Sequence, residues 1–295
     1  MGNNRLYIKD ESANLLTIRD PQIMVVGDTY YLTGTQPPYW EGPNAGVHLW
    51  STKDLEHFTD HGLILKREDM PEHMWCRDRF WAPELFDGKD GWFYLTFNCR
   101  NDSKEYYCEH SVGLARAREA TGPYEILTKD KPLIAGNDAN LFLDDEGALR
   151  LACTTGGKLM IFKLDPESVS LSDGITVCTV GKEGEWDSIG VEGQFVLKRC
   201  GRWFQWYSSW TTGYHAGILT ADCVDGPWTK YENNPVLTDS ADWDRAGHNH
   251  GFTGPDGRDY ITFHANLKEP DGEDVERFFI RPVVYKEDGT VPGFD

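Results

Sequence analysis

Five segments of the chain share a glycine followed by an alternating run of residues that is typical of a β-strand. They read GDTYYLTGT from Gly27, GWFYLTFNC from Gly91, GALRLACTT from Gly147, GRWFQWYSS from Gly201 and GRDYITFHA from Gly257. A strand-like run also precedes each glycine, so each segment predicts a β-hairpin. The glycines are 64, 56, 54 and 56 residues apart, which leaves room for about four short strands per repeat. The pattern therefore predicts an all-β fold, a single-domain five-bladed β-propeller over residues 1–295.

One residue at the head of each hairpin is acidic in four repeats and a histidine in the fifth. These residues, seven or nine positions before the glycine, are Asp20, Glu84, Asp138, Glu192 and His248. Offsets that differ by two leave strand side chains on one face. Because the first strand of a propeller blade lines the central axis, we expect the five residues to form a ring at one mouth of the channel. The alternative for any single position is an acidic residue that only fills a turn.

Composition narrows the classes of function. The net charge of −19 argues against nucleic acid and anionic membranes as partners, because both require clustered Lys and Arg. No apolar stretch approaches the roughly 20 residues that span a bilayer, and the first residues lack the apolar core of a signal peptide. We therefore expect a cytoplasmic protein, with a leader that has been trimmed off as the alternative. The 7 cysteines form no CxxC pair, which favours buried free thiols in a reducing compartment.

Six motifs, taken together in this order, resemble glycoside hydrolase family 43. They are RDPQI at residues 19–23, HLWSTKDLEHFTDHG at 48–62, FWAPELF at 80–86, NDANLFLDDEG at 137–147, VEGQFVLKRCGRWF at 191–204 and GHNHGFTGPDGR at 247–258. The resemblance runs through most of the chain. It implies a five-bladed propeller that hydrolyses glycosidic bonds, with an oligosaccharide as its partner.

The resemblance also implies a role for each of three carboxylates. Asp20 stands where the family has its general base, Glu192 where it has its general acid, and Asp138 where it has the carboxylate that raises the pKa of the acid. Such a pair suits inverting hydrolysis, in which one carboxylate activates water and a protonated one serves the leaving oxygen. We expect exo action on short plant-type oligosaccharides, as an α-L-arabinofuranosidase or a β-xylosidase. Pro21 predicts an extended backbone at Asp20.

Two turns depart from the family pattern. Asp138-Ala139-Asn140 replaces the usual Asp-Pro-Ser, and Glu192-Gly193-Gln194 replaces the common Glu-Gly-Pro. These differences leave the reaction class in place and make the usual assignments of substrate less secure.

Four further residues are candidates for substrate binding. Trp81 resembles the aromatic wall of the family's sugar pocket, with a core tryptophan as the alternative, and Glu84 is expected either to bind a sugar hydroxyl or to brace the ring of strands. His248 resembles a family histidine near the axis that in some members helps to hold a hydrated cation, so a structural Ca²⁺ there is an open expectation beside a purely structural histidine. Arg277 is expected to orient a substrate group or to form a surface ion pair. We expect that no cofactor is required.

Two other readings of the sequence stay open. One is a related propeller glycosidase, of the fructosidase or anhydrogalactosidase type, with a different mechanism. The other is a non-catalytic glycan-binding propeller, which would need no ring of acidic residues. The sequence also predicts that a strand at residues 15–18 closes the propeller beside a strand at residues 278–285.

Overall fold

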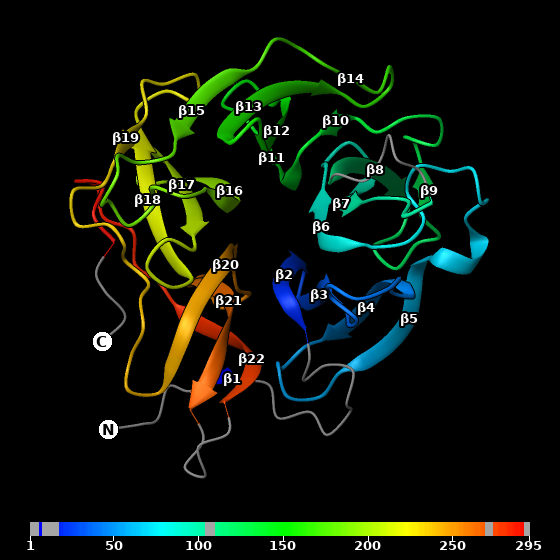
Figure 1. The fold of residues 1–295 in the computed structure, drawn as a ribbon, viewed down its shortest axis with the longest axis horizontal. Helices are drawn as coiled ribbons and strands as arrows, with labels where there is room; N and C mark the ends of the chain where they lie inside the picture. Colours follow the sequence, from blue (N-terminus) through cyan, green and yellow to red (C-terminus); the bar gives the residue numbers. More distant parts are fainter. Residues whose placement is uncertain (1–5, 8–17, 104–109, 269–273, 292–295) are drawn as a thin grey trace.

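Five antiparallel sheets surround a central axis (Figure 1). The computed structural model describes residues 6–7, 18–103, 110–268 and 274–291. Each sheet follows the chain from its innermost strand outwards, and the next sheet begins again at the axis. This arrangement confirms the five-bladed propeller that the glycine repeat predicts.

Each blade has four or five strands, and one of them, in blade 5, comes from the other end of the chain. Blade 1 contains β2 (Arg19–Val26), β3 (Thr29–Thr35), β4 (Gly46–Thr52) and β5 (Thr59–Lys66). Blade 2 contains β6 (Trp81–Asp87), β7 (Phe93–Cys99), β8 (Ser111–Ala117), β9 (Glu125–Ile126) and β10 (Ile134–Ala135). Blade 3 contains β11 (Asn137–Leu143), β12 (Leu149–Thr155), β13 (Lys158–Asp165), β14 (Ser170–Leu171) and β15 (Ile175–Thr179).

The last two blades follow the same plan. Blade 4 contains β16 (Glu192–Arg199), β17 (Arg202–Ser209), β18 (His215–Ala221) and β19 (Thr229–Lys230). Blade 5 contains β20 (Trp243–Thr253), β21 (Asp259–Lys268), β22 (Asp274–Pro282) and β1 (Leu6–Tyr7). A single 3₁₀ turn, η1 (Arg67–Asp69), is the helical element of the described residues.

The repeated glycines lie where the sequence places them, in the turn between the first two strands of each blade. All five have positive φ, between 61° and 87°, which is the left-handed region that a side chain disfavours; they are Gly27, Gly91, Gly147, Gly201 and Gly257. The repeat therefore reflects a conformational need of the hairpin turn.

The ring closes between blade 5 and blade 1. Each innermost strand contacts its two neighbours around the axis, and β20 contacts β2. The N-terminal strand that joins blade 5 is β1, in which Leu6 pairs with Ile280 of β22. Closure at residues 15–18 was a wrong prediction where it can be checked: Ile18 is buried but belongs to no strand, and residues 15–17 lie outside the described part. Ile18 packs between blades 1 and 5 without pairing in a strand.

The hydrophobic core is divided among the interfaces between consecutive blades. For example, Phe80 of blade 1's connection to blade 2 packs with Phe97, and Phe142 of blade 3 packs with Trp203 of blade 4. The cluster that joins Leu32 of blade 1 to Phe252 of blade 5 closes the circle. Burial of large apolar side chains between sheets is thus the main force that holds the blades together.

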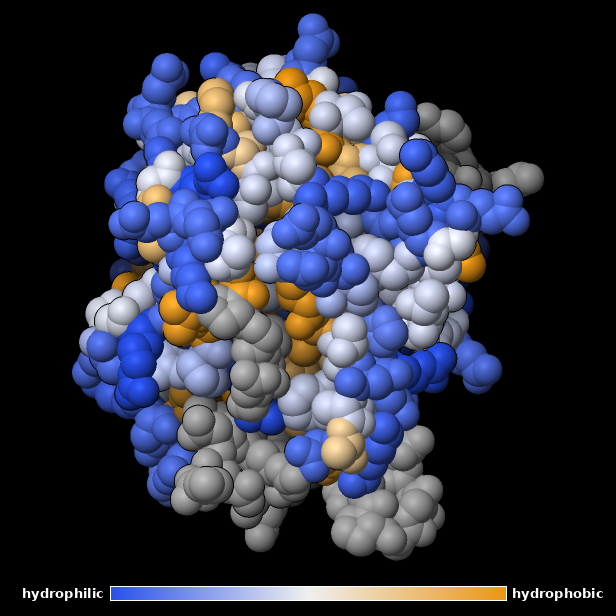
Figure 2. Space-filling view, turned by 90° about the vertical axis from the view of Figure 1, so that its left-hand side faces the viewer, coloured by the Kyte–Doolittle hydropathy of each residue, from blue (hydrophilic) through white to orange (hydrophobic). Residues whose placement is uncertain are grey.

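The outer surface is largely hydrophilic. The side of the propeller in Figure 2 carries mostly polar residues, with apolar side chains set between them. Among the described residues no helix has the length and apolar character needed to cross a membrane. The six described cysteines are free thiols, four of them buried, whereas Cys200 and Cys223 are exposed, contrary to the expectation for those two; Cys108 lies outside the described residues.

Candidate active site

A β-bulge interrupts every innermost strand at the same mouth of the channel. The register with the second strand breaks after Arg19, Trp81, Asn137, Glu192 and Gly247 and resumes at Gln22, Glu84, Asn140, Phe195 and His250. The residue that follows each break has positive φ; these residues are Asp20, Ala82, Asp138, Gly193 and His248. Bulges of this kind redirect side chains next to functional sites.

The bulges correct the ring that counting from the glycines predicts. Asp20, Asp138 and His248 are equivalent, as expected. Glu192 lies one position before the equivalent place, which Gly193 occupies, and Glu84 lies two positions after it, which Ala82 occupies. Counting failed because the hairpin turns differ in length, so equal offsets did not mark equal positions. The five residues therefore occupy three layers of the channel mouth.

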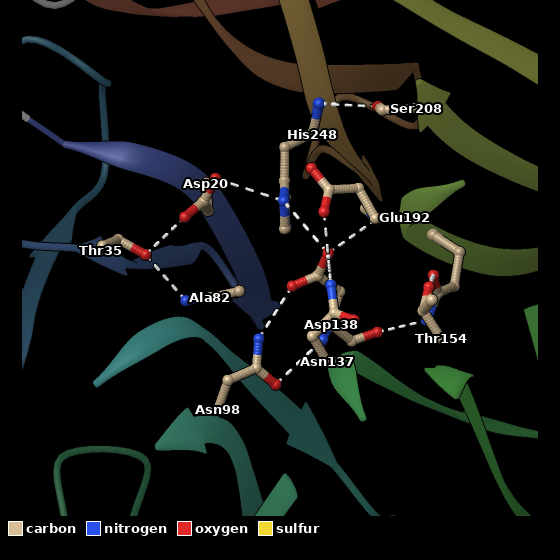
Figure 3. Close-up of polar contacts among 12 residues, drawn as sticks. Asp20, Thr35, Ala82, Asn98, Asn137, Asp138, Thr154, Glu192, Ser208 and His248 are labelled. Atoms are coloured by element: carbon tan, nitrogen blue, oxygen red, sulfur yellow. Dashed lines mark hydrogen bonds and ion pairs between the residues drawn. The ribbon is translucent and has the colours of Figure 1, made fainter. Parts of the chain in front are cut away.

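A small cavity of about 60 Å³ lies at this mouth, and we call it the inner pocket. All five innermost strands contribute to its wall, through Asp20, Trp81, Asp138, Glu192 and His248, and loops add Tyr39, Trp40, His110 and Tyr214. The fold thus brings together the predicted carboxylates of three blades, Asp20, Asp138 and Glu192, as Figure 3 shows.

Asp20 is held by hydrogen-bond donors and cations. Its Oδ2 accepts a 2.5 Å bond from the Thr35 hydroxyl, and its Oδ1 lies 3.2 Å from Nδ1 of His248 (Figure 3). Burial by itself would raise the pKa of Asp20, but the charge of His248, with His264 and Arg19, lowers it below its ordinary value. The carboxylate is therefore kept ionised. Its φ of 50° shows a left-handed backbone, so the extended geometry expected before Pro21 was wrong; the bulge sets the conformation.

Asp138 accepts several short hydrogen bonds. Its Oδ1 accepts from the Asn98 amide at 2.8 Å, and its Oδ2 accepts from the Gly193 backbone N–H at 2.8 Å and from the Asn137 amide at 2.9 Å (Figure 3). The Gly193 bond comes from the residue after Glu192. These hydrogen bonds hold the Asp138 carboxylate beside Glu192.

Glu192 has the opposite environment to Asp20. Burial raises the pKa of Glu192 to about 7, and the negative charge of Asp138 adds to the rise. Glu192 accepts hydrogen bonds from the Tyr214 hydroxyl, 3.0 Å from Oε1, and from the Asn137 amide, 3.4 Å from Oε2. A carboxyl group in this setting carries a proton at a pH where Asp20 does not.

Tyr214 reaches Glu192 because blade 5 leaves space for its ring. Gly247 occupies in blade 5 the place that Glu192 occupies in blade 4, and a Cβ on Gly247 would lie 2.5 Å from the Tyr214 ring. The missing side chain of blade 5 is thus replaced by an aromatic ring from the blade 4 loop.

His248 joins two of the carboxylates. Its Nδ1 lies 3.2 Å from Asp20 and 3.8 Å from Asp138, and its backbone N–H donates to Ser208 (Figure 3). Burial opposes a positive charge, but the surrounding carboxylates, Asp20 foremost, raise the pKa of His248 above its ordinary value. Among the described residues no three His, Cys, Asp or Glu side chains form a metal-binding group. These contacts do not fit a direct Ca²⁺ ligand set, which requires six to eight oxygens.

The other candidates lie in different places. Trp81 is buried in the wall of the inner pocket, where its indole N–H donates to the Tyr39 carbonyl at 2.8 Å. Glu84 is buried, does not line the inner pocket and accepts a 2.8 Å hydrogen bond from the Asn140 amide, so it connects strands β6 and β11. Arg277 does not line the inner pocket. Successive side chains of β22 point to opposite faces of the sheet, so Arg277 points away from Glu276. Its guanidinium donates a hydrogen bond to the Glu276 carbonyl.

Sequence reasoning missed several residues of the site. Arg19 and Asn137 directly precede Asp20 and Asp138. Each is the last paired residue before its bulge, which is also the position of Glu192. Once the bulge is known, this shared position identifies them in the sequence. His264 approaches Asp20 from β21, its Nδ1 accepting the Asp20 backbone N–H at 3.2 Å. Tyr214 lies in a loop that carries no strand pattern, so no signal in the sequence indicated it.

Comparisons with known proteins agree with this geometry. The family model described as glycosyl hydrolases family 43 matches residues 16–291. A β-D-galactofuranosidase of Aspergillus niger is 28% identical over 292 residues, which covers 92% of this chain and 81% of the relative. An extracellular exo-α-(1→5)-L-arabinofuranosidase of Cellvibrio japonicus is 22% identical and covers 86% and 80% of the two chains.

Solved structures have the same fold. A thermostable family-43 glycoside hydrolase superposes with a TM-score of 0.78 at 23% identity, covering 97% of this chain and 95% of that one. A Bacteroides thetaiotaomicron structure described as an endo-1,4-β-xylanase gives 0.76 at 26% identity, with 94% of each chain covered.

The match of the family model decides between the readings that the sequence left open. It covers all five blades, and it is a family-43 model, so the fructosidase and anhydrogalactosidase families and a non-catalytic propeller are set aside. With the fold, the motifs and the relatives in agreement, this chain belongs to glycosyl hydrolase family 43 and is an enzyme that hydrolyses glycosidic bonds.

Proposed function

We propose that the enzyme is an inverting exo-glycosidase that removes one terminal arabinofuranosyl or xylosyl unit from short plant-type oligosaccharides. In this proposal Asp20 is the general base, Glu192 is the general acid and Asp138 raises the pKa of Glu192. His248 orients Asp20, and Trp81 forms the wall against which the sugar stacks.

One feature carries the proposal: two carboxyl groups of the same pocket have surroundings that shift their pKa values in opposite directions. The donors around Asp20 lower its pKa, whereas burial and Asp138 raise the pKa of Glu192 to about 7. A water molecule can therefore lose a proton to Asp20 while Glu192 gives a proton to the leaving oxygen, which is the division of labour in glycoside hydrolysis. Each half of the step supplies about 10² to 10⁴ in rate in comparable enzymes.

The size of the inner pocket supports exo action. With a volume of about 60 Å³ and walls from all five innermost strands, it has room for at most the end of a sugar chain and not for a chain that passes through. The relatives support a pentose or furanose: one is described as an exo-α-(1→5)-L-arabinofuranosidase. A terminal galactofuranosyl unit is a second candidate, since the relative of 28% identity is described as a β-D-galactofuranosidase.

The proposal is tested in two steps. Purified enzyme is first offered nitrophenyl glycosides of α-L-arabinofuranose, β-D-xylose and β-D-galactofuranose, and we expect one of the first two to be cleaved best. The first-formed anomer is then followed by proton NMR on the preferred substrate. Inversion of the anomeric configuration is expected. Retention would contradict the roles assigned to Asp20 and Glu192, and cleavage of none of the three sugars would contradict the substrate class.

A further inference from the structure

One arrangement of hydrogen bonds repeats around the channel mouth. In every blade, a residue of the second strand pairs with the last residue before the bulge. In four of the five blades, as the described residues show, its side chain accepts a hydrogen bond from the backbone N–H of the positive-φ residue of the following blade (Figure 3). The acceptors and their donors are Thr35 with Ala82, Asn98 with Asp138, Ser208 with His248, and His264 with Asp20. Each of these bulges is thus tied to the blade before it.

The interface between blades 3 and 4 is the exception. Thr154 has the equivalent place in blade 3, but its hydroxyl donates toward blade 4, with Oε1 of Gln194 at 2.9 Å and the Val191 carbonyl at 3.2 Å. The N–H of Gly193, the positive-φ residue of blade 4, donates instead to Oδ2 of Asp138 at 2.8 Å. A backbone donor that the other blades give to a second-strand side chain therefore goes here to a carboxylate of the inner pocket.

Both ends of the Gln194 amide are occupied. Its Oε1 accepts from Thr154, and its Nε2 donates to the backbone carbonyl of Asp138. Because a carbonyl oxygen can only accept, the direction of the amide is fixed. The side chain is buried, so these hydrogen bonds are shielded from water. Gln194 thereby connects β16 with both β11 and β12 at the channel mouth.

Strands β11 and β16 depend on such side chains for their relative position. They belong to different sheets, so no ladder of backbone hydrogen bonds joins them in the described part of the chain. Gln194 connects them at the mouth, and two residues further along, the Val196 N–H donates to Oδ1 of Asn140 at 2.8 Å. Gln194 stands where the family commonly has proline, which offers no side-chain donor for the Asp138 carbonyl.

The Gln194 side chain acts on one of the groups that face Glu192. Charged and titratable side chains reach the two cavities lined by Glu192 from several strands and loops, and they are Arg19, Asp20, Tyr39, His110, Asp138, Tyr214, Arg245, His248, His264 and Glu276. Of this set, Asp138 is the residue that the Gln194 amide bonds in the described structure. The interaction between two carboxyl groups depends on their separation, so a less firmly held Asp138 would act less on Glu192.

We propose that Gln194 is a positioning residue for the hydrolysis, which holds the Asp138 carboxylate beside Glu192. By engaging Thr154, it leaves the Gly193 N–H to Asp138. This inference rests on the proposed function, because it takes Glu192 as the acid and Asp138 as the residue that acts on it. Gln194 does not line the inner pocket, so its effect on the reaction passes through Asp138.

The first test is Gln194→Met, which removes both hydrogen bonds and nearly keeps the volume of the side chain. Thr154 is then free to accept the Gly193 N–H, as its counterparts in the other blades accept theirs. The alkaline limb of the kcat/KM profile should move to lower pH by about half a pH unit, because Asp138 then raises the pKa of Glu192 less. Two other amides still hold Asp138, so the shift should be smaller than that of Asp138→Asn. A limb that stays in place overturns the inference.

The decisive variant combines Gln194→Met with Thr154→Val. Valine has the shape of threonine without its hydroxyl, so it cannot accept the Gly193 N–H and leaves that donor to Asp138. The double variant should therefore recover part of the shift, although it has lost more hydrogen bonds than the single variant. Thr154→Val alone should leave the limb in place. A purely structural role of Gln194 predicts no recovery, and a limb that moves as far in the double variant as in Gln194→Met overturns the inference.

Gln22→Met is the matched control. Gln22 and Gln194 are each 1% exposed, and the Gln22 amide connects blade 1 to the backbone of Leu85 in blade 2 by hydrogen bonds of 2.9 and 3.0 Å. Its replacement should lower stability to a similar extent and leave the limb in place. Equal shifts in the two glutamine variants would contradict a specific role of Gln194.

Gln194→Asn is a milder change that carries the test if Gln194→Met does not fold. Its shorter amide cannot reach both Thr154 and the Asp138 carbonyl, so the limb should move in the same direction. Circular dichroism checks the fold of every variant. An unmoved limb in folded Gln194→Asn then counts against the inference as it does for Gln194→Met.

A titration of Glu192 itself separates this inference from the proposed function. In protein labelled with ¹³C at the glutamate carboxyl carbons, the Glu192 signal is identified by its loss in Glu192→Gln, and NMR follows its midpoint without turnover. A lower midpoint in Gln194→Met that is partly restored by Thr154→Val supports the inference even if another group proves to be the acid. An unchanged midpoint overturns it even if hydrolysis proceeds as proposed.

Discussion

The hydroxyl group of Tyr214 donates a 3.0 Å hydrogen bond to Oε1 of Glu192. The two residues come from the same blade but from different parts of it, the loop before β18 and the first residue of β16. A hydrogen bond to a carboxylate stabilises its charged form, so Tyr214 works against the burial that raises the pKa of Glu192. The hydrogen bond from Tyr214 therefore keeps the pKa of Glu192 at about 7, below the value that burial and Asp138 would give without it.

Replacing Tyr214 with Phe should raise the pKa of Glu192. Because the acid must be protonated, the alkaline limb of the kcat/KM profile should move to higher pH, by about one pH unit. The profile of kcat/KM against pH on the preferred nitrophenyl glycoside measures the shift. Tyr260→Phe is the control, since its hydroxyl bonds Asp256 in a distant hairpin. A limb that stays in place or moves to lower pH contradicts the role of Tyr214.

Asp138→Asn should shift the same limb in the opposite direction. Its negative charge is the largest electrostatic contribution that raises the pKa of Glu192 after burial, so its removal lowers that pKa and the alkaline limb moves to lower pH. Activity at neutral pH should fall while activity near the acidic end is better preserved. Circular dichroism checks the fold, because Asn98, Asn137 and Gly193 lose part of their acceptor. A limb at higher pH would rule out Asp138 as the residue that raises this pKa.

Gly247→Ala should reproduce part of the effect of Tyr214→Phe without touching a polar group. The added Cβ would meet the Tyr214 ring at 2.5 Å and push its hydroxyl away from Glu192. We therefore expect the alkaline limb to rise in this variant and no additional rise when it is combined with Tyr214→Phe. Additive shifts in the double variant would show that Gly247 acts by another route.

Asp20→Asn and Glu192→Gln should each remove most turnover, by roughly 10² to 10⁴, and leave the fold intact. They should differ on an aryl glycoside with a good leaving group, which needs little protonation: Glu192→Gln should keep more activity there than on a disaccharide. Asp20→Asn should gain nothing from such a substrate, but azide can take the place of the activated water. Wild-type activity on the disaccharide in either folded variant would disprove that residue's role.

Glu84→Gln should stabilise the protein increasingly as the pH rises. Burial raises the pKa of Glu84 to about 8 from an ordinary value of 4.5, so the wild-type carboxyl group costs nothing below pH 4.5 and destabilises the fold progressively up to about pH 8. The difference in free energy of unfolding should grow by up to about 1.4 kcal/mol per pH unit in that window. The glutamine keeps an acceptor for Asn140. Urea titrations of both proteins at several pH values measure the difference in free energy of unfolding. A difference that does not change with pH would contradict the raised pKa of Glu84.

The sequence by itself determined the architecture. Each hairpin turn needs a left-handed residue, so Gly27, Gly91 and their counterparts repeat visibly, and the alternating runs behind them mark the strands. These requirements concern residues that are adjacent in the chain, so they can be recognised from the sequence alone. Asp20, Asp138 and His248 were found because the offsets of seven and nine residues from the glycine both lead to the residue of positive φ at the bulge of their blades.

Only the tertiary structure decided which side chains meet at the channel mouth. The bulges moved Glu192 to the rim and Glu84 below it, a shift of one or two residues that turn length concealed. Tyr214 and Gly247 come together across two blades, and Trp210 rests on Gly190 from another loop. Contacts between distant segments depend on how sheets pack around the axis, which no spacing along the chain records.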